Sequence, residues 1–112
     1  MIKKINGEFI LISNTTFTVL NKFSISINKN NVELIYLHGN IILSNAKMYY
    51  INSEAAFVFK TDAENFVIKK TKDPFQFEVY INKYTSIVLS NEIYEQFLYF
   101  MFLKYKSNLI EV

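Results

Sequence analysis

The segment that decides the fold lies close to the C-terminal end of the sequence. Residues 90–107 read SNEIYEQFLYFMFLKYKS, and apolar side chains recur there with the spacing of one helical face. Ser90 or Asn91 can cap the start of a helix, and the acidic residues near the start and the lysines near the end suit its dipole. The pattern predicts one helix, from near Glu92 to about Ser107, as the last element of the chain.

The part of the sequence before this helix has the pattern of short strands. Apolar and polar residues alternate at 23–27 and 75–82, whereas 9–12 and 41–43 are apolar on both faces. Polar turns rich in asparagine separate such runs at intervals of roughly 8–12 residues. This order predicts a mainly β fold: an antiparallel β-barrel or sandwich of about seven to nine strands, capped by one C-terminal helix, in a single domain over residues 1–112.

The chain is long enough and apolar enough to form a hydrophobic core that needs no disulfide or structural metal ion. The chain has 112 residues, of which 51% are hydrophobic and 17% aromatic, and it has no cysteine. A domain of this size buries roughly 65% of the surface that its unfolded chain exposes. The absence of cysteine excludes disulfides and thiolate metal sites and fits a reducing compartment.

The charge pattern argues against a simple nucleic-acid binder. The net charge is +2, whereas direct binders of nucleic acid usually have a strong basic excess. All twelve basic residues are lysines, so the sequence has no guanidinium group for bidentate recognition of phosphate or carboxylate. Any anion site must therefore use lysines, backbone N–H groups or hydroxyls.

The sequence lacks the apolar segments that direct a chain into or across a membrane. No apolar run reaches the roughly 18 residues that a spanning helix needs. Residues 1–8 include two lysines, but Asn6 and Glu8 interrupt the apolar stretch that a signal peptide would need. We therefore expect a soluble, cytoplasmic protein.

No set of residues in the sequence has the composition of a catalytic site. His38 is the one histidine, so neither a second histidine nor a cysteine is present to complete a zinc site. Asp62, Glu64 and Asp73 do not have the spacing of a calcium loop. The two glycines are too far apart to form a phosphate-binding loop. We expect no enzymatic activity, no metal and no cofactor.

Lys69, Lys70 and Lys72 form the densest cluster of basic residues, in an expected connection between two strands. One interpretation is a solvated edge that discourages association between sheets. The other is an anion site, for a phospholipid (phosphoinositide) headgroup or for RNA phosphates, with tyrosines elsewhere in the strands available to stack on bases.

The expected helix has more apolar surface than one buried face requires. The face expected to pack on the core contains Ile93, Phe97, Phe100 and Met101. Tyr99, Phe102 and Leu103 lie on the opposite face, among charged residues. Either the helix is packed more deeply than usual, or these three residues form an aromatic contact patch for a protein partner.

Residues 39–50 have the pattern of a known family. They read GNIILSNAKMYY: a glycine, a short apolar strand ending in leucine, a hydroxyl residue, two turn residues, a basic residue and an apolar strand with an aromatic. The segment resembles the GRAM hairpin of the pleckstrin-homology-like (PH-like) superfamily, with Ser44 in place of the family's threonine and Lys47 in place of its arginine. The order of strands followed by one helix is similar too. The resemblance implies a PH-like barrel that acts by binding.

Three functions follow as hypotheses. The first is a non-catalytic binding module that acts through protein–protein interaction, at the outer helix face or at a sheet edge that accepts an added strand. The alternative is a small ribosome-associated accessory or dormancy factor that contacts ribosomal RNA and ribosomal proteins through its lysines. Weak binding to phosphoinositides at a membrane surface is the third.

Overall fold

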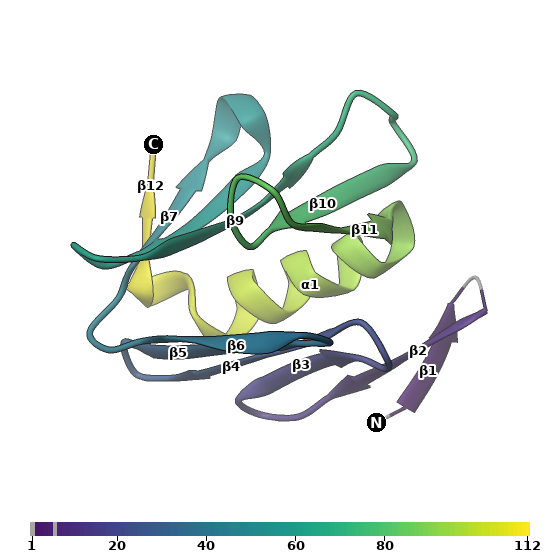
Figure 1. Cartoon of the computed structure of the whole chain (residues 1–112), viewed down its shortest axis with the longest axis horizontal. Helices are drawn as coiled ribbons and strands as arrows, with labels where there is room; N and C mark the ends of the chain where they lie inside the picture. The colour runs from purple at the N-terminus through teal and green to yellow at the C-terminus, as the bar shows by residue number, and fades with distance from the viewer. Residues whose placement is uncertain (1, 6) are drawn as a thin grey trace.

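Two six-stranded sheets form the body of the protein in the computed structural model, which describes residues 2–5 and 7–112. The first sheet is an antiparallel meander in chain order: β1 (Ile2–Ile5), β2 (Glu8–Ile12), β3 (Thr16–Val19), β4 (Phe23–Asn28), β5 (Asn31–Tyr36) and β6 (Gly39–Leu43). The second sheet has the order β11–β10–β9–β8–β7–β12, and its strands are β7 (Lys47–Ile51), β8 (Ala56–Lys60), β9 (Asn65–Lys70), β10 (Gln76–Tyr80), β11 (Ser86–Ser90) and β12 (Leu109–Glu111). Figure 1 shows the two sheets as facing layers.

The alternating pattern of the strands decides which side chains enter the core. In β4, Phe23, Ile25 and Ile27 are buried while the serines between them are half-buried on the outer face. The turns use residues that tolerate a left-handed backbone, for example Asn21 with φ 66° and Asn45 with φ 56°. The sequence pattern therefore sets both the inward faces and the reversals of the meander.

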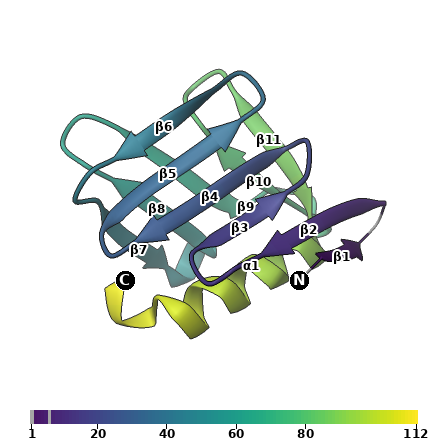
Figure 2. The same ribbon diagram turned by 90° about the horizontal axis from the view of Figure 1, so that it is seen from below.

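One helix, α1 (Asn91–Lys104), fills an open side of the sandwich between the two layers (Figures 1 and 2). Its buried face consists of Ile93, Tyr94, Phe97, Phe100 and Met101. The ring centroid of Phe97 lies 5.4 Å from that of Phe17 in the first sheet and 5.2 Å from that of Phe57 in the second. The helix therefore joins both sheets into one hydrophobic core.

Side-chain hydrogen bonds fix the helix to the sheets at both of its ends. Near the start, the Tyr94 hydroxyl donates to the carbonyl of Ala55 at 2.7 Å. Just after the end, the hydroxyl of Tyr105 lies 3.0 Å from the carbonyl of Ile27 in β4. Lys104 donates to the carbonyl of Ser13 at 2.6 Å. These bonds hold the helix against the second sheet at one end and the first sheet at the other.

The mainly β sandwich with one C-terminal helix is confirmed, but several details of the prediction were wrong. The described residues form twelve strands rather than seven to nine, and the sheets do not close into a barrel. The helix ends at Lys104 and is not the last element, because a 3-10 turn η2 (Lys106–Asn108) and strand β12 follow it. Strand β12 has only three residues, too few for a periodic signal, and its pairing parallel to β7 depends on the tertiary fold.

The segment 39–50 forms strand, turn and strand, but the two strands do not pair as a hairpin. Strand β6 pairs with β5 in the first sheet, whereas β7 pairs with β8 and β12 in the second. The turn at Ser44 and Asn45 therefore carries the chain from one sheet to the other. It is held by hydrogen bonds from Asn45 N–H to Asn31 Oδ1 (3.0 Å) and from Ala46 N–H to the Asn30 carbonyl (2.6 Å).

Candidate binding surfaces

The three helix residues expected to contact a partner differ in their exposure. Tyr99 and Leu103, one helical turn apart, are each 63% exposed. Phe102 is half-buried, with its ring centroid 5.0 Å from that of Tyr50 and 5.7 Å from that of Phe57. The packing interpretation therefore explains Phe102, and the outward apolar surface of the helix is reduced to Tyr99 and Leu103.

The predicted lysine cluster does not form a convergent site. Lys69 and Lys70 lie within strand β9 instead of in a connection, so their side chains point to opposite faces of the sheet. Lys69 lies opposite Glu78, and its ammonium is 5.1 Å from the centroid of the Tyr80 ring. Lys72 is exposed in the following turn. The three charges therefore have separate environments.

The β1–β2 hairpin projects beyond the rest of the first sheet (Figures 1 and 2). Ile2 lies opposite Leu11 and Lys4 lies opposite Phe9, so these four side chains share one face. Ile2, Phe9 and Leu11 are 66%, 43% and 38% exposed, and the ammonium of Lys4 lies 5.7 Å from the centroid of the Phe9 ring. This face is apolar at the surface of the molecule, and we call Ile2, Phe9 and Leu11 the hairpin patch.

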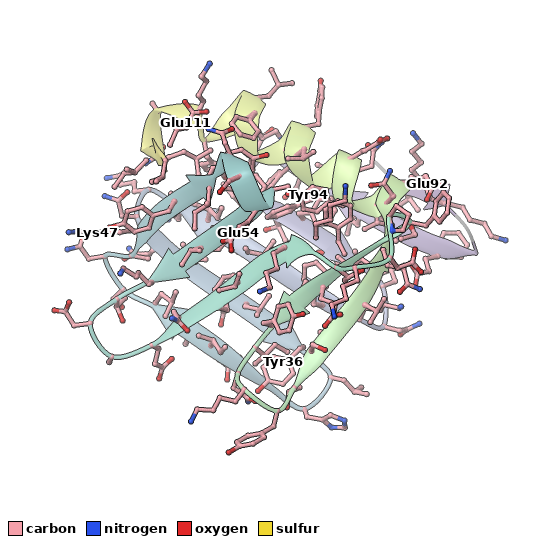
Figure 3. All side chains as sticks on the ribbon, turned by 90° about the horizontal axis from the view of Figure 1, so that it is seen from above. Tyr36, Lys47, Glu54, Glu92, Tyr94 and Glu111 are labelled. Atoms are coloured by element: carbon pink, nitrogen blue, oxygen red, sulfur yellow. The ribbon has the colours of Figure 1, made fainter. Side chains whose placement is uncertain are left out.

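A second pair of lysines is brought together by strand register. Lys47 in β7 lies directly opposite Lys60 in β8, and both side chains are exposed. Figure 3, which looks onto the second sheet, shows Lys47 projecting outwards at its margin. The residues are 13 positions apart, and their juxtaposition depends on the turn at η1 (Asn52–Glu54). Sequence reasoning missed the pair because it did not fix this register.

Among the described residues, the buried titratable side chains are those of Tyr94 and Tyr105. The one histidine, His38, is exposed in the turn between β5 and β6. Burial, together with the nearby Tyr50, raises the pKa of the Tyr94 hydroxyl well above its usual value, and burial also raises the pKa of Tyr105. Residues 2–5 and 7–112 contain no group of three or more histidine, aspartate or glutamate side chains placed to hold a metal ion.

The helical part of the described chain is short. None of its helices has the length and apolar character needed to cross a membrane. Comparison with protein-family models, curated proteins and solved structures gave no match.

Proposed function

We propose that the protein is a non-catalytic binding module whose partner is another protein. The observation that carries the proposal is the free edge of β1. This strand pairs with β2 on one side and has no strand on its other side among the described residues. Unpaired backbone N–H and C=O groups on such an edge can bind an extended segment of another chain by adding a strand.

The hairpin patch lies beside this edge and would contribute binding energy. Its three apolar side chains are partly in water, and burial of apolar surface contributes roughly 25 cal/mol per Å². Contiguous exposed apolar surface is typical of sites that contact other proteins. A strand added to β1 would place its own alternate side chains next to Ile2 and Lys4, which share the face of the hairpin patch.

The charges of β1 favour an acidic partner. Lys3 and Lys4 are both exposed and point to opposite faces of the strand, so each face of the edge has one ammonium group. Opposite charges across neighbouring strands stabilise pairing, whereas like charges oppose it. The partner segment therefore combines apolar residues with aspartate or glutamate at the positions opposite the lysines.

Tyr99 and Leu103 on the helix form a second surface for the same class of partner. They are separated from β1 along the chain, and their exposure is comparable to that of Ile2. Two sheets with one helix across an open side also support assignment to the PH-like class, whose members act largely as binding modules. We include that assignment in the proposal.

The test is an affinity purification from the native cell, followed by mass spectrometry, with three forms of the protein. The first form is wild type, the second carries Phe9→Ser and Leu11→Thr, and the third carries Leu37→Ser and Ile42→Ser as a matched control. Leu37 and Ile42 are 77% and 61% exposed and lie at the other end of the first sheet.

We expect one or more proteins to be captured by wild type and by the control, and lost with the Phe9 and Leu11 variant. Identical captured sets from all three forms would overturn the assignment to β1, and a parallel Tyr99→Ser, Leu103→Ser variant then tests the helix. Ribosomal proteins in the lost set are the outcome that the ribosome-associated alternative requires. Circular dichroism confirms that each variant is folded.

A further inference from the structure

Two exposed lysines lie opposite each other on the outer face of the second sheet. Lys47 and Lys60 are direct cross-strand partners in the antiparallel pair β7–β8. Neither forms an ion pair within residues 2–5 and 7–112, in contrast to Lys22, whose ammonium lies 2.6 Å from Glu8. Like charges directly opposite each other destabilise an antiparallel pair. The arrangement therefore opposes folding, and an anion bound between the two ammonium groups would remove the repulsion.

The two lysines line a polar pocket of about 610 Å³. Its other lining residues are Ser44, Asn45, Tyr49, Thr61 and Asp62. The volume lies within the range of about 300–1,000 Å³ that is typical of small-molecule sites. The ammonium of Lys60 lies 5.5 Å from the centroid of the Tyr49 ring, which keeps this charge close to the sheet.

Hydrogen bonds close both turns that border the pocket. The turn at Asn45 is fixed by its backbone N–H, which donates to Asn31 Oδ1 at 3.0 Å. The turn at Thr61 is closed by a hydrogen bond from its N–H to the carbonyl of Glu64 at 2.9 Å, and its hydroxyl accepts from the N–H of Glu64 at 3.2 Å. The backbone of these turns would therefore require little ordering when a ligand binds, which lowers that part of the cost of binding.

We propose that Lys47 and Lys60 together bind the phosphate of a small phosphomonoester. A phosphomonoester has a charge of about −1.5 to −2 at neutral pH, which matches two ammonium groups. A phosphodiester in a nucleic-acid backbone has a single negative charge, so the pair favours the monoester. Without arginine the recognition uses lysines as point charges, which bind phosphate without bidentate geometry. This site is independent of the β1 edge.

Asp62 provides an internal check on the proposal. Its carboxylate lines the same pocket and would repel a bound phosphate. Removal of this charge should therefore strengthen phosphate binding. A purely structural role for the lysines would predict no change in binding on Asp62→Asn.

The experiment is a titration of the protein with methyl phosphate, followed by ¹H–¹⁵N NMR. We expect saturable shifts at the amides of Asn45, Lys47 and Lys60. Lys47→Gln or Lys60→Gln should each weaken binding about fivefold, as for a partly screened surface charge. Asp62→Asn should strengthen it, and Lys70→Gln, a matched loss of one positive charge on another strand, should leave the dissociation constant unchanged.

Two further arms distinguish the sources of the phosphate. Phosphatidylcholine vesicles with and without phosphatidylinositol 4-phosphate test a lipid headgroup, since binding that requires both the phosphoinositide and Lys47 identifies the membrane as the source. Response to methyl phosphate with no vesicle binding identifies a soluble metabolite. The proposal is overturned if methyl phosphate causes no saturable shift, if dimethyl phosphate or an oligouridylate binds as tightly as methyl phosphate, or if Lys70→Gln weakens binding as much as Lys47→Gln.

Thermal unfolding gives a readout that does not depend on detection of the complex. In phosphate-free buffer, Lys47→Gln should raise the melting temperature, because it removes the repulsion from Lys60. Added methyl phosphate should raise the melting temperature of wild type more than that of the variant, because a ligand that binds the folded state stabilises it. A lower melting temperature for Lys47→Gln without ligand would contradict the proposed repulsion.

Discussion

At the scale of single residues, Tyr94 is a buried tyrosine whose ring and hydroxyl both have close partners. Its ring stacks on Phe77 with a centroid distance of 3.5 Å, and its hydroxyl donates to the Ala55 carbonyl. Tyr94→Phe keeps the ring and removes the hydrogen bond, so we expect the free energy of unfolding to fall by about 1 kcal/mol. Urea denaturation measures the change. Tyr84→Phe is the control, because Tyr84 is 92% exposed, and an equal loss in the control would contradict the assignment.

Alkaline pH should lower the stability of the folded protein through the same residue. Burial raises the pKa of Tyr94 in the folded protein above the value of about 10 that tyrosine has in an unfolded chain. Above this pH the unfolded chain releases the proton while the folded protein retains it, so stability is full below about pH 10 and falls as the pH rises further. Tyr94→Phe removes this contribution. Unfolding measured from pH 8 upwards should therefore show a shallower decline for Tyr94→Phe than for wild type, and parallel curves would contradict the assigned burial.

Ser90 occupies the N-cap position of the helix without acting as a side-chain cap. Its backbone is extended, as at other N-caps, but its hydroxyl is buried and has no hydrogen-bond partner among the described residues. Loss of a working N-cap typically costs about 1 kcal/mol. We expect Ser90→Ala to change the free energy of unfolding by less than about 0.5 kcal/mol, because an unsatisfied buried hydroxyl is removed. A loss of about 1 kcal/mol or more in urea denaturation would show that the hydroxyl has a partner.

At the scale of elements, the outer side of the helix includes Phe102, which packs on the body of the protein, and Tyr99, which is exposed to solvent. Phe102→Ala should lower the free energy of unfolding by about 2 kcal/mol, below the range of about 3–5 kcal/mol for fully buried phenylalanine, because the ring is half-buried against Tyr50 and Phe57. Tyr99→Ala should change it by less than about 0.5 kcal/mol. Chemical denaturation of the two variants measures the difference. Equal losses would mean that Tyr99 also packs on the body of the protein.

The same elements show which structural features can be predicted from local sequence patterns and which cannot. The alternation at 23–27 and the apolar face of the helix depend on local periodicity. The alternation was predicted correctly, and so were four of the five buried helix residues, whereas the burial of Tyr94 was not predicted. Strand β12 and the pairing of Lys47 with Lys60 depend on register and on contacts between distant segments, which local patterns do not contain. The helix surface was predicted in part, because the pattern identifies the outward residues but not the neighbours that cover Phe102.

At the scale of the whole molecule, the free edge of β1 could also join two copies of the protein. Antiparallel pairing of β1 with its counterpart about a two-fold axis would place Lys3 opposite Lys3 of the second copy, or Lys4 opposite Lys4, and this repulsion keeps the edges apart. We expect Lys3→Thr with Lys4→Thr to cause concentration-dependent association, measured by sedimentation velocity. Lys70→Thr with Lys72→Thr makes the same change in net charge away from this edge and should remain monomeric. Association of both variants would attribute the effect to net charge, and association of neither would mean that the β1 lysines do not protect the edge.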